Sequence, residues 1–161
     1  MSLSLRPVSP DDEVFLLQVY ASTRAEEMAL VPWSEEQKQA FVRMQFDAQR
    51  ESYQQQFPDA EYHVILQDGV AAGRLIVDRT DERILLIDIA LLPAFRNLGI
   101  GSNLIGDLKA ETLKTGKPLW LDVESFSPAL GLYERLGFTK IDESGFYLRM
   151  EWRPRENATT A

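Results

Sequence analysis

The stretch LLIDIALLPAFRNLGIGS, residues 85–102, decides the fold of this chain. Its first part, Leu85–Leu92, is short, unbroken and rich in Leu and Ile, which is typical of a strand buried on both faces. Pro93 ends that run. Beyond the following turn, apolar residues recur at roughly helical spacing: Leu104, Ile105, Leu108 and Leu113. The stretch therefore predicts a strand, a tight turn and a helix in succession.

The turn carries the pattern Arg96-x-x-Gly99-x-Gly101, which favours phosphate binding. The first N–H groups of a helix have no acceptor within the helix, and the helix dipole places partial positive charge there. Glycine lets the backbone approach a ligand closely, and Arg96 adds a fixed cation. The alternative is a turn whose glycines only permit tight packing. A P-loop is excluded because no Lys-Ser or Lys-Thr pair closes the turn, and a dinucleotide fingerprint lacks its third glycine.

Composition describes one ordinary globular domain. The chain has 161 residues, of which 45% are hydrophobic and 26% charged. It has no cysteine and a single histidine, His63, which excludes thiolate chemistry and a multi-histidine metal site. The net charge of −8 argues against a nucleic-acid partner. Without a signal-like start or a long apolar run, we expect a cytoplasmic protein with no membrane contact.

The remaining pattern predicts a mixed α/β sheet with helices on both faces, in one domain over residues 1–152 with a polar tail over 153–161. The expected strands are Leu3–Val8, Glu61–Leu66, Val70–Asp78, Arg83–Leu92, Leu119–Val123 and Phe146–Trp152. The expected helices begin after Ser9, after Ser34, at Gly101 and at Ser127, the first with an inward stripe of Val14, Leu17 and Ala21.

Helix-start signals are clear at two of these points. Ser9-Pro10 places a capping side chain before a proline at the first helical position. Ser34-Glu35-Glu36-Gln37 has the spacing of a capping box. The helix after Ser34 has a broken apolar face of Phe41, Met44, Phe46 and Tyr53. That face forms core or, together with the loop 28–33, lines a substrate cleft, and both alternatives are open.

Two motifs together resemble the GNAT superfamily of acyl-CoA-dependent N-acyltransferases. They are DIALLPAFRNLGIGSNLI, Asp88–Ile105, and SPALGLYERLGF, Ser127–Phe138. The first resembles the family's pyrophosphate-binding motif and the second its helix ending in Tyr-x-x-x-Gly-Phe. The resemblance covers Leu3–Trp152. It implies a central, mostly antiparallel sheet of six to seven strands with helices on both faces and a splayed strand pair that holds coenzyme A.

The resemblance also implies a set of cofactor contacts. The strand carrying Ile89, Ala90, Leu91 and Leu92 would pair with the pantetheine arm, and an N–H near Leu91 would face the thioester oxygen. The pyrophosphate would bind beside Arg96 to the N–H groups of Asn97, Leu98, Gly99, Ile100, Gly101 and Ser102. Ala129 and Phe126 would also contact the cofactor. Many relatives have an Asn where this chain has Phe126, which cannot make that hydrogen bond and would pack on the arm or leave the contact to a neighbouring serine.

Catalytic roles follow from the same resemblance. Tyr133 resembles the tyrosine that protonates the leaving thiolate, because a phenol with a pKa near 10 stays protonated at neutral pH. The alternative is an amphipathic core residue. Asp88 is the first candidate for the base or a water relay and Glu124 the second, and each could equally be a solvated acid.

We therefore expect direct transfer of an acetyl group from acetyl-CoA to a primary amine on a small molecule or peptide, without a metal or a covalent enzyme intermediate. The acidic balance favours a cationic acceptor. The candidate acceptor contacts are Trp33, Tyr53, Glu61 and Tyr62. The rival hypotheses are a non-catalytic acyl-CoA-binding regulator and an unrelated nucleotide-phosphate binder. By analogy with the family, a homodimer is an open alternative to a monomer.

Overall fold

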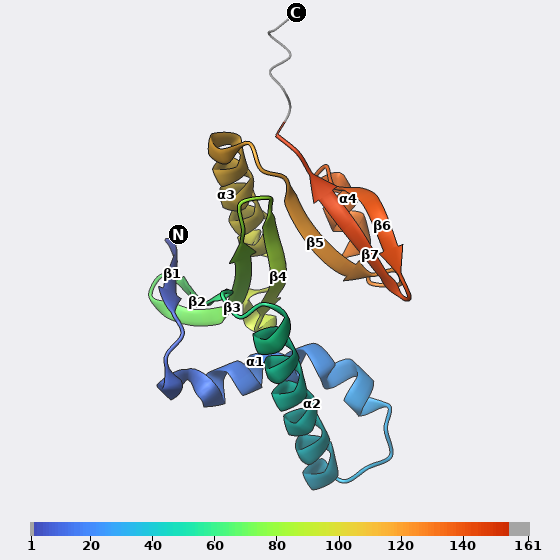
Figure 1. Cartoon of the computed structure of the whole chain (residues 1–161). Helices are drawn as coiled ribbons and strands as arrows, with labels where there is room; N and C mark the ends of the chain where they lie inside the picture. Colours follow the sequence, from blue (N-terminus) through green and yellow to red (C-terminus); the bar gives the residue numbers. More distant parts are fainter. Residues whose placement is uncertain (1, 155–161) are drawn as a thin grey trace, which may run out of the picture. The chain divides into compact units, whose positions relative to one another are not determined.

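The computed structural model describes residues 2–154, and the tail expected over 153–161 lies mostly outside that range. Figure 1 shows the elements. The strands are β1 (Leu3–Pro7), β2 (Glu61–Gln67), β3 (Val70–Arg79), β4 (Ile84–Leu91), β5 (Leu119–Glu124), β6 (Thr139–Ser144) and β7 (Tyr147–Trp152). The helices are α1 (Glu13–Ala29), α2 (Glu35–Gln56), α3 (Ile100–Thr115) and α4 (Leu130–Arg135), with short 3-10 turns at Pro10–Asp12 and Pro93–Phe95.

The strands of the described chain form a seven-stranded sheet in the order β1-β2-β3-β4-β5-β7-β6. β1 pairs antiparallel with β2, and β7 pairs antiparallel with both β5 and β6. β4 and β5 are parallel, and α3 connects them along the chain. The turn between β2 and β3 has positive φ at both Asp68 and Gly69, as a two-residue hairpin requires. This confirms the predicted fold class of a mixed, mostly antiparallel sheet with packed helices.

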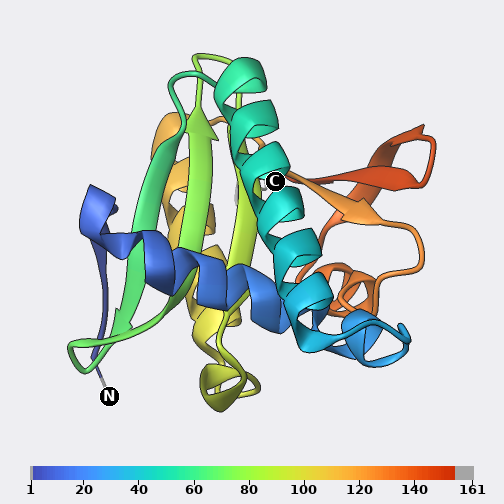
Figure 2. The ribbon, with the colours of Figure 1, turned by 90° about the horizontal axis from the view of Figure 1, so that it is seen from below.

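The chain divides into two compact units. The first contains Met1–Ile76 and Asp88–Leu98. In this unit α1 and α2 lie on the same face of the strands (Figure 1, Figure 2). Phe46 of α2 is buried together with Tyr20 of α1, and their rings are 5.7 Å apart. An apolar layer between the two helices and the strands therefore forms the core of this unit.

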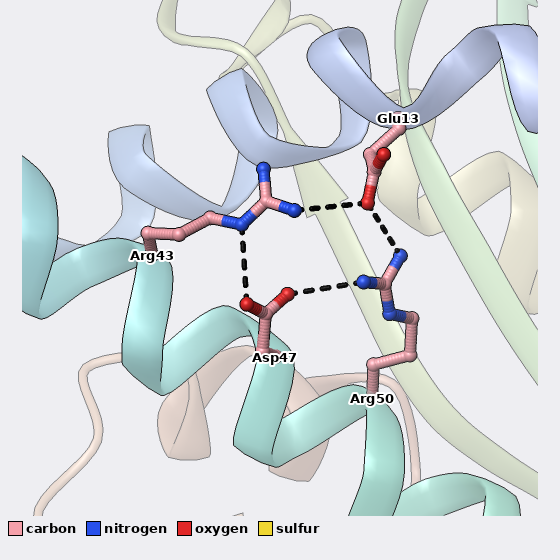
Figure 3. A network of polar contacts seen from close by, with 4 residues as sticks. All are labelled: Glu13, Arg43, Asp47 and Arg50. Carbon is pink, nitrogen blue, oxygen red and sulfur yellow. Dashed lines mark hydrogen bonds and ion pairs between the residues drawn. The ribbon is translucent and has the colours of Figure 1, made fainter.

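A ring of four charged side chains joins the two helices of the first unit (Figure 3). One carboxylate oxygen of Glu13, at the start of α1, accepts from Arg43 and Arg50 of α2, at 3.1 Å each. Asp47 accepts from the same arginines at 3.2 and 3.0 Å. Because all four side chains are partly solvated, the ring sets the register between the helices more than it adds stability.

The second unit contains Val77–Ile87 and Gly99–Ala161. Here α3 packs on β5. The buried residues of α3 recur on one face: Ile100, Leu104, Ile105, Leu108 and Thr112. The helix ends at Gly116, whose φ of 76° is the left-handed conformation of a helix C-cap. The strand, turn and helix predicted for residues 85–102 are thus confirmed.

Four sequence expectations are wrong in detail. Val14 is 70% exposed, because the turn Pro10–Asp12 shifts the start of α1 and rotates its face. Leu113 is exposed, and Thr112 takes the buried position. The helix expected from Ser127 begins at Leu130, after a turn. The strand β6 was not expected, because all six of its side chains are exposed and no apolar alternation marks it.

Candidate functional site

The burial and the pairing of strand β4 change along its length. Ile84, Leu85 and Leu86 are buried, whereas Ile87 to Ile89 and Leu91 are half-buried. The parallel register with β5 covers the pairs from Ile84–Leu119 to Leu86–Leu121. Both strands continue beyond those pairs, to Leu91 and Glu124. The two strands are therefore not paired along their full length in the described chain.

On its other side, β4 lies very close to β3. A Cβ placed on Gly73 of β3 would collide with the carbonyl oxygen of Ala90 and come within 3.0 Å of the Cα of Leu91. The N–H of Leu92 donates to the carbonyl of Ala72 at 2.9 Å. Glycine is needed here because only a residue without Cβ allows this approach. The Leu92 N–H is thereby engaged within the protein, so the predicted contact of Leu92 with a cofactor arm would have to use another group.

The turn after β4 ends in an uncapped helix terminus. Asn97 and Gly99 have φ of 61° and 83°. Gly99 is the N-cap residue of α3 and offers no side-chain acceptor. The first bond of the helix runs from the N–H of Asn103 to the carbonyl of Gly99, at 3.0 Å. The N–H groups of residues 100–102 therefore have no acceptor within the helix, and the dipole adds partial positive charge to them.

Arg96 contacts protein groups on both sides of this turn. Its Nε donates to the carbonyl of Leu91 at 2.9 Å. Its Nη2 donates to the hydroxyl of Ser22 on α1 at 3.1 Å and to the Ser22 carbonyl at 3.3 Å. Arg96 thus ties the end of β4 to α1. Its guanidinium is exposed, and the expected contact with a phosphate stays a prediction.

Asp88 on β4 is held by a buried arginine that the sequence reasoning missed. Nε of Arg74, on β3, lies 2.6 Å from Oδ2 of Asp88, and Nη2 lies 2.6 Å from Oε1 of Gln49 on α2. Arg74 is only 7% exposed. A charged residue inside an apolar strand must be paired when it is buried, and this rule was the available signal. The pairing therefore orients the carboxylate.

Tyr133 lies near the end of the short helix α4. Its N–H donates to the carbonyl of Ala129 at 3.1 Å, and the hydroxyl of Ser127 accepts from the N–H of Ala129 at 3.1 Å. The Tyr133 ring packs edge-to-face on Phe138, with centroids 6.1 Å apart. The sequence-predicted tyrosine is thus held by the backbone of its helix, and its ring contacts Phe138.

Phe126 and Glu124 lie where β5 ends. Phe126 is 70% exposed and packs edge-to-face on Phe146, at 6.4 Å. The carbonyl of Phe146 accepts from the N–H of Ser125 at 2.7 Å, and the carbonyl of Glu124 accepts from Ser127. Phe126 therefore presents an apolar face to solvent.

The candidate acceptor residues do not gather at one place. Tyr53 and Tyr62 line the same small cavity of about 30 Å³ beside Arg74. Burial raises the pKa of Tyr62. Trp33 packs edge-to-face on Phe41 at 5.2 Å, and Glu61 is exposed at the start of β2.

A much larger pocket of about 710 Å³ lies between α1 and α2. Its apolar wall includes Leu17, Ala21, Ala25, Met28 and Val42, and its polar residues include Glu35 and Lys38. Ser22, the partner of Arg96, lies within one helical turn of Ala25 and adjoins this wall. The predicted contribution of the loop 28–33 is limited to its first residues, Met28 and Ala29.

Within 2–154, no group of three or more His, Asp or Glu side chains is placed to hold a metal ion. No described helix is both long enough and apolar enough to span a membrane.

The family model of the GNAT acetyltransferases matches residues 24–138, and the chain belongs to that family. The structure is similar to that of PaiA N-acetyltransferase from Thermoplasma acidophilum in complex with coenzyme A. The TM-score is 0.70 and the identity 21%, over 96% of this chain and 100% of that one. It is also similar to an acetyltransferase from Thermus thermophilus, with a TM-score of 0.69 and 19% identity over 96% and 98% of the two chains.

A curated relative gives a sequence match. The [ribosomal protein bS18]-alanine N-acetyltransferase of Haemophilus influenzae is 30% identical over 95 residues. The match spans 58% of this chain and 65% of that relative.

Proposed function

We propose that this protein transfers an acetyl group from acetyl-CoA directly to a primary amine whose carbon skeleton is apolar beside the amine. The observation that carries the proposal is the start of α3. Three N–H donors without helical acceptors follow Gly99, shortly after a strand that resembles part of the family's pyrophosphate-binding motif. Such a terminus suits a diphosphate because it offers donors and positive potential without a competing cap.

The residues present fit coenzyme A at three points. The amides of Ile100, Gly101 and Ser102 would hold the diphosphate. The half-buried part of β4, beyond its pairing with β5, would offer backbone groups to the pantetheine arm. Acetyl-CoA supplies an activated acyl group and a thiolate leaving group. In this proposal the hydroxyl of Tyr133 donates a proton to that thiolate, which suits a phenol at neutral pH.

The pairing of Asp88 with Arg74 determines which role we propose for this carboxylate. One oxygen of this carboxylate already accepts a hydrogen bond from Nε of Arg74 at 2.6 Å, and that contact fixes its orientation. We therefore assign Asp88 to orienting the incoming ammonium group and a water that takes its proton. Glu124 stays the alternative for that step. Asp88→Asn and Glu124→Gln should separate the two: the variant that lacks the true participant should show the larger loss of kcat.

The acceptor proposal rests on the pocket between α1 and α2. Its wall is apolar, and Glu35 and Lys38 supply one charge of each sign. An amine next to a methyl or larger apolar group, as at a peptide N-terminus or on a small hydrophobic amine, matches that lining. The Haemophilus influenzae relative acts on an alanine by its name, which supports testing peptides that begin with small apolar residues.

Release of free thiol from acetyl-CoA tests the proposal. The panel should contain peptides beginning with Ala or Ser, hydrophobic monoamines and polyamines, with wild type and Tyr133→Phe. We expect turnover that depends on the amine and falls about a hundredfold in Tyr133→Phe. Tight coenzyme A binding without turnover on any amine would instead support the regulator. Thermal stabilisation by ATP or NAD but not by coenzyme A would support a nucleotide binder.

A further inference from the structure

Lys109 is an unusual lysine in the second unit. It lies on α3, and its Nζ donates to the carbonyl of Leu136, the C-cap residue of α4. The same ammonium lies 5.6 Å from the ring centroid of Phe138 and 5.1 Å from that of Trp152. Burial lowers the pKa of Lys109. The side chain is half-buried, with a carbonyl and two aromatic rings around its charge.

These contacts stabilise the end of α4. The last carbonyls of a helix lack donor partners within the helix and carry partial negative charge, so a lysine there is favourable. An ammonium over two aromatic faces adds further attraction when it is partly desolvated. The next residue, Gly137, has φ of 94°, and a Cβ there would lie 3.2 Å from Cδ1 of Trp152. Lys109 and Trp152 therefore fix the turn that ends α4.

That turn also fixes Tyr133. The N–H of Phe138 donates to the carbonyl of Tyr133 at 3.0 Å, and the two rings are in edge-to-face contact. Phe138 is almost fully buried, at 2% exposure. A displacement of the turn would therefore move Tyr133 through both its backbone and its ring. Helix α4 has only six residues, so it has little internal rigidity of its own.

We propose that Lys109 is a positioning residue for Tyr133: its ammonium anchors the end of α4 and thereby holds the tyrosine hydroxyl in place. The inference rests on the proposed function, in which Tyr133 is the proton donor. It adds a residue on a different helix, outside both sequence motifs, to the requirements of the reaction. Loss of the anchor should affect the chemical step more than cofactor binding, because α4 contributes the acid while the start of α3 holds the diphosphate.

The test compares Lys109→Met, Lys109→Arg and the control Lys114→Met, an exposed lysine on the same helix. We expect Lys109→Met to lower kcat about tenfold and to change KM for acetyl-CoA less than about twofold. A small displacement of a catalytic group is enough to lower the rate by such a factor. Lys109→Arg should recover most of kcat, because arginine keeps the charge and stacks on aromatic rings. Lys114→Met should resemble wild type.

A double-mutant cycle provides the stricter readout. In the Tyr133→Phe background, Lys109→Met should lower kcat less than about twofold, since no hydroxyl remains to be positioned. An equal factor in both backgrounds would overturn the inference, as would a change confined to KM.

Failure of the proposed function can be told apart from failure of this inference. If the wild type turns over no amine, the function is refuted, and ¹³C labelling of the tyrosine rings still tests the anchor. The Tyr133 resonance, assigned by its absence in Tyr133→Phe, should shift in Lys109→Met and not in Lys114→Met. An unshifted resonance in a folded Lys109→Met protein would show that Lys109 does not position Tyr133.

Discussion

Two helices of this protein begin in opposite ways. At the start of α2, the hydroxyl of Ser34 accepts from the N–H of Gln37 at 3.2 Å, and the Gln37 side chain accepts from the N–H of Ser34 at 3.0 Å. At the start of α3, Gly99 in the left-handed conformation offers no such acceptor. The difference indicates that the start of α2 satisfies its own donors, whereas the start of α3 leaves its donors available to a ligand.

The turn before α1 is a second closed start. Asp12 accepts from the N–H of Ser9 at 2.8 Å and from both Nη atoms of Arg6, at 2.7 and 2.8 Å. This carboxylate is nearly buried, and the arginine pair together with the Ser9 amide holds its pKa well below its usual range. We call a helix start closed when a side chain accepts from its N–H groups and open when none does. The same kind of substitution, a change of charge in the first turn, can therefore compare the two.

The largest effect is expected from Ser102→Asp. The new carboxylate lies in the first turn of α3, where it interacts favourably with the helix dipole but repels a diphosphate. We expect the affinity for coenzyme A to fall at least about a hundredfold, because a carboxylate placed against a diphosphate costs several kcal/mol of binding free energy. The melting temperature should be unchanged or higher. Isothermal titration and thermal denaturation measure the two effects.

Gln37→Glu is the matched control, because it places a carboxylate at the equivalent position of α2. It should leave coenzyme A affinity unchanged. If Ser102→Asp binds coenzyme A as well as wild type does, the diphosphate does not bind at the start of α3 and the proposed function loses its main support.

The next largest effect is expected from Asp12→Asn. Loss of the charged partner of Arg6 should lower the free energy of unfolding near neutral pH by about 2 kcal/mol. Because the pKa of Asp12 is lowered in the folded protein, its contribution is present above an unfolded pKa of about 3.9 and is lost as the pH falls further.

Urea titrations of both proteins across the acidic range would show this dependence. The gap between wild type and Asp12→Asn should be constant from neutral pH down to about pH 5 and narrow below about pH 4. A gap that stays constant throughout would mean that the charge of Asp12 does not stabilise the fold.

A smaller effect is expected from Ser34→Ala. Removing one N-cap hydroxyl should lower the free energy of unfolding by about 1 kcal/mol. Because α2 does not belong to the cofactor site, the affinity for coenzyme A should stay the same. A loss of affinity larger than about twofold, measured on folded protein, would mean that the start of α2 contributes to the cofactor site after all.

The closed starts could be predicted from the sequence, because capping is local and Ser34 and Gln37 are three residues apart. The open start could be predicted from glycine spacing and the strand before it. The Arg74–Asp88 pair could not, because its partners lie on different strands and only the sheet brings them together. The exposed strand β6 carries no apolar pattern to mark it, and Lys109 resembles any surface lysine until α4 is placed against it.

The smallest effect is expected at Gly131, which tests whether every glycine near a helix start serves a ligand. Gly131 lies in the first turn of α4, and a Cβ there would meet only the far end of the Arg135 side chain, at 3.3 Å. Gly131→Ala should therefore raise the free energy of unfolding by about 0.5 kcal/mol, since alanine is the better helix former and Arg135 can move aside. Coenzyme A affinity should change less than about twofold, because the proposed diphosphate site lies at the start of α3 and not at this glycine. A folded Gly131→Ala protein that has lost coenzyme A binding would show instead that the ligand approaches α4 at Gly131.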